Sequence, residues 1–358
     1  MTDLLVRCAQ LVDIFSVSHH EQAIADFVEG ELRAVPWLAV HRLDNNVVAR
    51  TGLGRPQRLL LAGHVDTVPA NGNERARIDG DVLWGLGAAD MKSGCAVLLE
   101  LARSVARPAV DVTYVFYECE EVSSAFNGLT KLLHQRPDLG AADAAVLGEP
   151  TSARIEAGCQ GTLRLDVTLV GRRAHSARPW MGRNAIHRLG PLLERCRAYQ
   201  ERRPVLDGCQ YREALQVVFV AGGVATNVVP DRVTVHLNHR YAPDRTAADA
   251  VEHVRRFLGD VVDEAGGDVV ELADHADGAP PGLGHPLLAG LARRVGQPPR
   301  AKLGWTDVAL FSARGIPAVN FGPGDPAVAH SAEERVARSE MDDVFEALRS
   351  LLEEGPGG

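Results

Sequence analysis

The sequence predicts an α/β protein in which a small ferredoxin-like unit interrupts a larger unit with a largely parallel central sheet. Three observations support this prediction. The chain has 358 residues, more than a single domain usually contains. Strand and helix patterns alternate near both ends, whereas the middle has a different order. Hydrophobic residues make up 46% of the chain and charged residues 24%, so there is enough apolar material for buried cores.

The first part of the chain, to about residue 150, alternates between short apolar runs and a helical pattern. Strand-like runs are expected at Arg58 to Ala62, Val112 to Tyr117 and Ala144 to Leu147. A helical pattern occupies Met91 to Val105. Short strands separated by helices favour parallel pairing, and this part is therefore expected to form a parallel sheet.

The middle of the chain has a βαββαβ order, which is typical of ferredoxin-like units. The expected elements are a strand at Leu163 to Val170, a helix at Arg183 to Tyr199, strands at Leu215 to Ala221 and Arg232 to Tyr241, a helix at Ala247 to Leu258 and a strand at Asp268 to Leu272. We interpret this unit as a domain inserted into the larger one.

The α/β pattern resumes after a Gly/Pro-rich segment at 278–282. Helices are expected at His285 to Val295, Thr306 to Ala313 and Ser339 to Leu352, with a strand at Ala318 to Phe321. The predicted organisation is therefore a large domain at 1–157 and 277–358, with the inserted domain at 158–276.

Charge and segment composition exclude several classes of partner. The net charge is -9, and no dense run of Lys and Arg interrupts the acidic balance, so nucleic acid is not an expected partner. The N-terminus lacks a basic region followed by an apolar core, and no segment has the apolar length needed to span a membrane. We expect a cytoplasmic protein that does not associate with membranes.

The six cysteines are scattered and show no CxxC spacing, so we expect buried thiols and not disulfides. They are Cys8, Cys95, Cys119, Cys159, Cys196 and Cys209.

Acidic residues and histidines follow the predicted strands of the large domain, where ligands of open α/β sheets usually bind. The candidates are His64 and Asp66 after 58–62, Glu118, Glu120 and Glu121 after 112–117, Glu149 after 144–147, His330 after 318–321, and Asp90 before the helix at 91–105. Each alone has an ordinary explanation, such as a carboxylate at a helix N-terminus. Together, two histidines and several carboxylates favour zinc, or a similar ion such as cobalt or manganese.

These residues lie in motifs that resemble those of the M20 metallopeptidases. The motifs are Gly63-His64-Val65-Asp66-Thr67-Val68-Pro69, Gly85-Leu86-Gly87-Ala88-Ala89-Asp90-Met91-Lys92, Glu120-Glu121 and Gly148-Glu149-Pro150. The resemblance covers essentially the whole chain. It implies that the large domain is a zinc-exopeptidase-like catalytic domain and that the inserted domain is a dimerisation or lid domain. Further segments around Gly158, His175, Thr306 and Gly322 are similar to members of the actinobacterial type that remove succinate from N-succinyl-diaminopimelate.

The resemblance implies a role for each residue of the metal site. Asp90 would bridge two metal ions, with His64 and Glu149 completing one site and Glu121 and His330 completing the other. Asp66 would lie behind His64 and fix its tautomer. Glu120 would act as the general base, taking a proton from the attacking water and giving it to the leaving amine.

The resemblance also implies groups that contact the substrate, a small anionic N-acyl amino acid. His175 would stabilise the developing oxyanion. Arg240 would bind a substrate carboxylate, Asn227 and Thr306 would make further contacts, and Arg178 is another candidate, for which a solvated role is the alternative. The family commonly pairs two subunits through the small domain, so a homodimer is expected.

Two other functions stay open. The chain can be another M20 deacylase, such as one for acetylornithine, or an aminopeptidase that uses the same metals on a different group. It can also be a catalytically silent protein that has kept the fold, although Glu120 and all five expected metal ligands are present.

Overall fold

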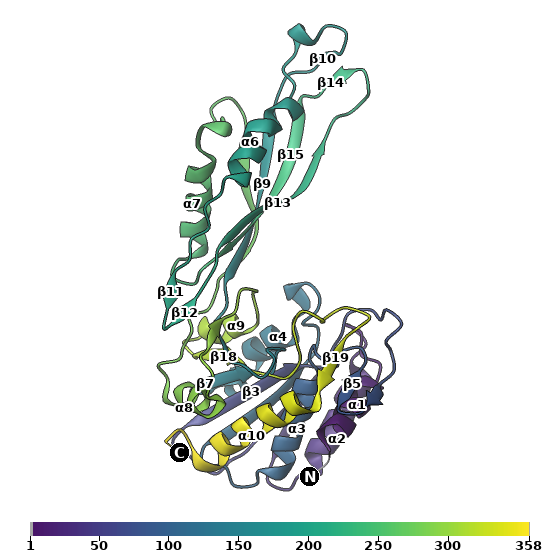
Figure 1. The fold of residues 1–358 in the computed structure, drawn as a ribbon, viewed down its shortest axis with the longest axis vertical. Helices are drawn as coiled ribbons and strands as arrows, with labels where there is room; N and C mark the ends of the chain where they lie inside the picture. The colour runs from purple at the N-terminus through teal and green to yellow at the C-terminus, as the bar shows by residue number, and fades with distance from the viewer. Residues whose placement is uncertain (1–2, 358) are drawn as a thin grey trace. The chain divides into compact units, whose positions relative to one another are not determined.

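The computed structural model describes residues 3–357 and divides into two compact units (Figure 1). The large unit comprises Met1–Gly158, Pro281–Ala301 and Asp307–Gly358, and the small unit comprises Cys159–Pro280 and Lys302–Thr306. The sequence placed residues 302–306 in the large domain. They belong with the small unit because the Gln160 amide donates to the Lys302 carbonyl at 3.2 Å and Trp305 Nε1 donates to the Asp277 carbonyl at 3.0 Å.

An eight-stranded sheet forms the centre of the large unit. In spatial order its strands are β1 (Ala39–Leu43), β2 (Asn46–Arg50), β6 (Asp111–Tyr117), β3 (Arg58–His64), β7 (Ala144–Leu147), β18 (Ala318–Asn320), β8 (Glu156–Ala157) and β17 (Arg300–Ala301). Parallel pairing joins β6 with β3, β3 with β7, and β7 with β18. The predicted α/β fold with a mostly parallel sheet is therefore confirmed. The antiparallel pairs of β1 with β2 and of β2 with β6 add a hairpin at one edge.

Helices cover both faces of this sheet (Figure 1). The helices α1 (Leu4–Val12), α3 (Lys92–Ser104) and α10 (Arg338–Glu354) pack against one another on one side, and α3 contacts β3 and β6. The remaining helices are α2 (Gln22–Arg33), α4 (Gly128–Gln135), α5 (Pro137–Gly140), α8 (Pro286–Val295), α9 (Val308–Ser312) and the 3-10 turn η1 (Ser124–Phe126). A second, three-stranded sheet contains β19 (Arg335–Ala337), β5 (Val82–Trp84) and β4 (Arg77–Asp79).

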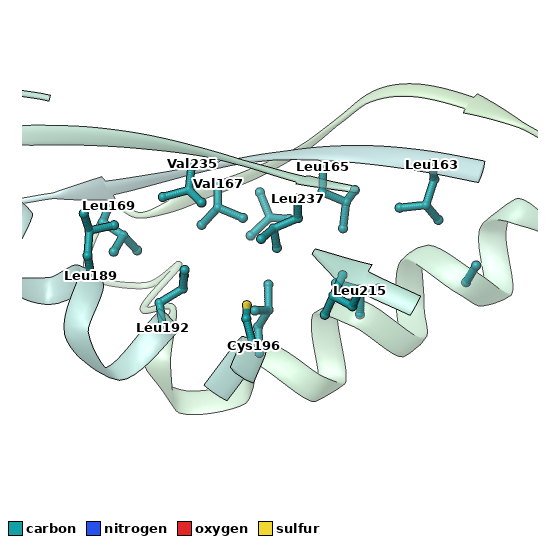
Figure 2. Packing of buried hydrophobic residues seen from close by; sticks show 14 of the residues in the cluster. Leu163, Leu165, Val167, Leu169, Leu189, Leu192, Cys196, Leu215, Val235 and Leu237 are labelled. Atoms are coloured by element: carbon teal, nitrogen blue, oxygen red, sulfur yellow. The ribbon is translucent and has the colours of Figure 1, made fainter. Parts of the chain in front are cut away.

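The small unit has the predicted ferredoxin-like order. Its elements along the chain are β9 (Gly161–Val170), α6 (Leu189–Arg197), β13 (Ala214–Gly222), β15 (Arg232–Tyr241), α7 (Ala247–Leu258) and β16 (Val269–Ala276). The strands form one antiparallel sheet in the spatial order β13-β15-β9-β16. Alternate side chains of β9 and β15 are buried, and Figure 2 shows that those of Leu165, Val167 and Leu237 point towards the helical layer.

The first helix of the small unit begins later than the sequence indicates. Arg183 pairs with Arg172 in an isolated bridge, and the Asn184 side chain accepts a hydrogen bond from the His187 amide. These contacts keep the start of the predicted helix at 183–199 in a turn. The 3-10 helix η3 (Ile186–Arg188) then leads into α6.

Short elements complete the small unit. They are β10 (Ala174–His175) paired with β14 (Val228–Val229), β11 (Val205–Leu206) paired with β12 (Cys209–Gln210), η2 (Pro179–Met181) and η4 (Gly259–Val261). All six cysteines are buried and free, as the sequence predicts. Among residues 3–357, no helix is both long and apolar enough to cross a membrane.

Candidate metal centre

His64 is the last residue of β3, and its imidazole is almost completely buried. Its Nδ1 lies 3.4 Å from Asp66 Oδ1, and its Nε2 lies 3.1 Å from Asp90 Oδ1. Burial alone would lower the pKa of His64, but hydrogen bonds to Asp66 and Asp90 raise it well above its usual value. The strongly acidic surroundings of His64 therefore favour positive charge at this position.

Asp66 is fully buried and is held by groups from three parts of the large unit. It accepts hydrogen bonds from the Ser18 hydroxyl at 2.7 Å and from the backbone amides of Glu120 and Glu121 at 3.0 and 3.1 Å. Burial raises its pKa, but hydrogen bonds from His64 and Ser18 lower it to about 2. Asp66 is therefore an anion that orients His64 and also fixes the turn after β6.

Asp90 lies just before α3, at the meeting point of two groups of side chains. One group is His64, Asp90 and Glu149, and the other is Asp90, Glu121 and His330. Within each group, one possible ligand atom per residue lies within 4.8 Å of the others. His330 Nε2 is 2.8 Å from Glu121 Oε1 and 3.6 Å from Asp90 Oδ2. The five residues proposed as ligands from the sequence are thus brought together with Asp90 common to both groups.

Glu120 lies beside this cluster, and with His64 and Glu121 it forms a further group of the same kind. Its pKa is raised well above the usual value, chiefly by burial, and the neighbouring acids Glu149 and Asp307 add to this effect. A carboxyl group beside candidate metal ligands can accept a proton from water and release it again. The position of Glu120 therefore suits proton transfer.

The cluster is chemically suited to divalent cations. It combines two imidazoles with several carboxylates, the donor set that zinc, cobalt and manganese accept. Lys92, the nearest ammonium group along the chain, turns away and donates to the carbonyls of Leu11 and Ile14 at 3.0 and 2.9 Å. The acidic groups are therefore gathered without this lysine to balance them, as expected where cations supply the positive charge.

Two buried acids that support the centre were not identified from the sequence. Glu334 is 1% exposed, and its Oε1 accepts hydrogen bonds from the Ala89 and Asp90 amides at 3.1 and 3.0 Å. Asp307 is fully buried, and its Oδ2 accepts a hydrogen bond from Asn127 Nδ2 at 2.9 Å. Glu334 lies in a loop, where the sequence has no helix or strand periodicity, so nothing in the sequence pattern marked it as a functional residue. Asp307 directly follows Thr306, in one of the further segments that resemble the family, and that resemblance could have indicated it.

The candidate substrate residues all lie in the small unit, where they form two groups. His175 is in β10. The Ser176 amide donates to the Asn227 carbonyl at 2.9 Å, and the Arg178 amide donates to the His175 carbonyl at 2.8 Å. The side chains of His175, Arg178 and Asn227 are exposed. These three residues thus share one end of the small unit.

Arg240 and Thr306 belong to the other end of the small unit. Arg240 is half-buried near the end of β15, where it pairs with Ala214 and Thr162, and burial lowers its pKa. Thr306 is buried, and its carbonyl lies 3.7 Å from Cys159 Sγ. β15 has 10 residues, a length of about 30 Å at the usual strand rise. The loop that follows Gly171 lies at the opposite end of β15, because the Gly171 amide donates to the Asp231 carbonyl. Within one small unit, Arg240 is therefore distant from this loop.

The chain is similar in sequence to known proteins over almost its whole length. Over 352 residues, covering 98% of both chains, the sequence is 52% identical to a putative succinyl-diaminopimelate desuccinylase of Mycobacterium tuberculosis. It is 46% identical to the succinyl-diaminopimelate desuccinylase of Corynebacterium glutamicum, over 98% of this chain and 96% of that one.

Solved structures show the same fold at low sequence identity. A tripeptidase from Staphylococcus aureus covers 99% of this chain and 98% of its own, with a TM-score of 0.79 at 19% identity. The YXEP protein of Bacillus subtilis, described as a dinuclear metal binding peptidase, has a TM-score of 0.71 at 14% identity and covers 97% of this chain and 96% of its own. Residues 60–354 match the peptidase family M20/M25/M40, and the chain therefore belongs to this family.

Proposed function

We propose that this protein is a metal-dependent amide hydrolase that converts N-succinyl-LL-2,6-diaminopimelate and water into succinate and LL-2,6-diaminopimelate. This reaction is a step of diaminopimelate and lysine biosynthesis. The observation that carries the proposal is the pair of ligand groups sharing Asp90. The two desuccinylases at 52% and 46% identity support the choice of acyl group.

In this proposal the cluster holds two divalent ions, with zinc preferred and cobalt or manganese as alternatives. His64 and Glu149 would hold one ion, Glu121 and His330 would hold the other, and Asp90 would be shared by both. When bound, such ions make a water molecule more acidic and polarise the amide carbonyl. The acid-rich, largely buried surroundings of the cluster support this assignment.

The chain's own residues would then move the proton and align the ligands. Glu120 takes the proton of the attacking water and delivers it to the amine that leaves when the amide bond breaks. Asp66 keeps His64 in one orientation, because three donors fix the Asp66 carboxylate in turn. His175 is the proposed donor to the oxyanion that develops on the carbonyl oxygen.

The substrate carries several carboxylates, so its binding site needs donors with fixed geometry. Arg240 can make a bidentate fork to one carboxylate, with Thr306, Asn227 and Arg178 as additional donors. Because Arg240 and His175 belong to different ends of one small unit, a single small unit does not bring them to one substrate. We therefore propose that the protein is a homodimer in which the two ends come from different chains. The cytoplasmic location stays a prediction.

A substrate panel tests the proposed reaction. Metal-loaded protein would be assayed against N-succinyl-LL-diaminopimelate, N-acetylornithine and a tripeptide, because the tripeptidase with the same fold makes peptide cleavage the second candidate. We expect kcat/KM to be highest for the succinyl substrate by at least about tenfold, which corresponds to about 1.4 kcal/mol. Preference for acetylornithine or the tripeptide would reassign the substrate, and no activity on any of them would favour a silent scaffold.

A further inference from the structure

A second group of metal-binding side chains lies in the large unit, outside the candidate metal centre. Glu21, Glu118 and Cys119 each offer one ligand atom, and these atoms lie within 4.8 Å of one another. The Nδ1 atom of His19 is 3.5 Å from Cys119 Sγ. The proposed reaction uses none of these four residues, so this cluster, the Cys119 cluster, requires a separate explanation.

One carboxylate oxygen organises the Cys119 cluster. Glu21 Oε1 accepts hydrogen bonds from the backbone amides of His19 and Cys119 at 2.9 and 3.2 Å, and Cys119 Sγ is 3.3 Å from the same oxygen. His19 and Cys119 both have left-handed backbone conformations, with φ of 73° and 58°. Two chain segments that are far apart in sequence are thus held with their donor atoms facing each other.

The other oxygen of the same carboxylate has no donor. Glu21 is completely buried, and within residues 3–357 its Oε2 accepts no hydrogen bond. A buried carboxylate oxygen left without a donor is costly to stability, and such groups are rare in folded proteins. A cation beside Glu21 would satisfy this oxygen.

Two of the distances between donor atoms, both from Cys119 Sγ, are those expected around a tetrahedral cation. Zinc binds thiolate sulfur at about 2.3 Å and imidazole nitrogen or carboxylate oxygen at about 2.0 to 2.2 Å, so neighbouring ligand atoms lie about 3.6 Å apart. The distances from Cys119 Sγ to His19 Nδ1 and to Glu21 Oε1 are 3.5 and 3.3 Å. Thiolate with imidazole and carboxylate favours zinc or cobalt, because magnesium and calcium prefer oxygen ligands alone.

The Cys119 cluster is also accessible. A pocket of about 600 Å³ is lined by all four of its residues and by Phe126 and Lys131. The ring of Phe126 meets that of His19 edge to face, with ring centres 5.0 Å apart, which orients the imidazole. The ammonium group of Lys131 is paired with Asp44. An ion can therefore enter from solvent and find a positioned imidazole.

We propose that Cys119, Glu21, Glu118 and His19 form a third cation site, which takes a thiophilic divalent ion of the zinc class. It is separate from the two sites proposed around Asp90. Cys119 directly precedes Glu120, so the third site lies on the same turn as the proposed general base.

Cobalt titration of the full-length, metal-stripped protein tests this proposal. Thiolate bound to Co²⁺ gives a sulfur-to-metal charge-transfer band in the near ultraviolet, and the sites proposed around Asp90 contain no thiolate. We expect this band to appear, and we expect Cys119→Ser to abolish it and to bind one equivalent less Co²⁺. Cys196→Ser, which changes a buried thiol of the small unit, is the matched control and should retain the band.

Glu21→Gln provides a second test that leaves the thiol in place. It should weaken Co²⁺ binding, followed by the charge-transfer band, by at least tenfold, because a neutral amide replaces the buried carboxylate. The proposal is overturned if metal-stripped protein shows no such band, or if the band persists in Cys119→Ser. If Cys119→Ser does not fold, as judged by circular dichroism, unchanged Co²⁺ affinity in Glu21→Gln overturns it.

Discussion

The large and small units differ in how firmly they hold their candidate functional groups. In the large unit, Asp66 is fully buried and accepts hydrogen bonds from Ser18, Glu120 and Glu121, and the backbone around Asp90 is tied to Glu334. In the small unit, His175, Arg178 and Asn227 are exposed. The large unit thus holds its candidate metal ligands in place, whereas these small-unit side chains are exposed; in the proposed function they would gain partners only when substrate binds.

We therefore expect substitutions of candidate site residues in the large unit to change the chemistry or the metal content, and those of candidate site residues in the small unit to change turnover or affinity while leaving the metal content unchanged. Substitutions in each unit test this difference.

Glu120→Gln should lower kcat by about 10² to 10⁴ while leaving the metal content unchanged, because glutamine keeps the size of the side chain but cannot accept the proton. Steady-state kinetics and elemental analysis of the purified variant would measure both quantities. Glu121→Gln is the matched control and should lose bound metal. Loss of metal in Glu120→Gln with retention in Glu121→Gln would reverse the two roles.

His175→Ala should lower kcat by about 10² to 10³ with a smaller change in KM, because it removes a donor to charge that develops in the transition state. Metal content should stay at the wild-type level. Mixing His175→Ala chains with Glu120→Gln chains should restore part of the activity if His175 acts on the partner's centre. Inactive mixtures, with subunit exchange verified, would place both groups in one chain's site.

The sequence predicted the large elements well, because burial imposes a regular pattern on them. β7, β15 and α7 have the predicted ends, since apolar periodicity and clear boundary residues define them. α7, for example, begins with a capping box formed by Thr246 and Asp249. The predicted ferredoxin-like order rests on six helices and strands of the small unit that show this kind of pattern.

Features that depend on tertiary contacts were not predictable in this way. The late start of α6 depends on the pairing of Arg183 with Arg172, which lie in different turns. Glu334 supports Asp90 from 244 residues away, and a lone acid in a loop has no pattern that reveals such a contact. The Cys119 cluster was missed because scattered cysteines without CxxC spacing indicate buried thiols, whereas its other donors come from a distant segment around His19 and Glu21.

Asp268→Asn should destabilise the small unit without changing metal content. Asp268 is buried, pairs with Arg188 at 2.5 and 2.6 Å and accepts from the Val170 and Asp263 amides. Removing one partner of a buried pair costs about 3 kcal/mol. Hydrogen exchange of the β9 amides would measure this loss. Exchange rates equal to those of the wild type would show that the pair does not stabilise the unit.

The same residue makes stability depend on pH. Burial raises the pKa of Asp268, but hydrogen bonds from Arg188 and backbone amides outweigh this and hold it below its usual value. The stabilisation is therefore present above the unfolded pKa of about 3.9 and is lost as pH falls through the folded pKa. The difference between wild type and Asp268→Asn should shrink below about pH 4. A difference that stays constant with pH would exclude this charge as its cause.

Arg240→Lys should raise KM for the succinyl substrate by about tenfold, with smaller changes in kcat, because lysine keeps the charge but loses the bidentate fork. Arg232→Lys, an exposed change in the first residue of β15, is the control and should behave as wild type. Unchanged kinetics in Arg240→Lys would remove this residue from the substrate site.

In the proposed function, two ions bound around Asp90 are required for desuccinylation. The most direct test of this requirement is to measure succinate release from N-succinyl-LL-diaminopimelate while Zn²⁺ is added in steps to metal-stripped protein. We use Cys119→Ser protein beside the wild type, so that ions bound at Cys119 are counted separately. The account predicts no turnover without metal and full turnover once the Asp90 sites are filled. Full turnover in rigorously metal-free protein would contradict it.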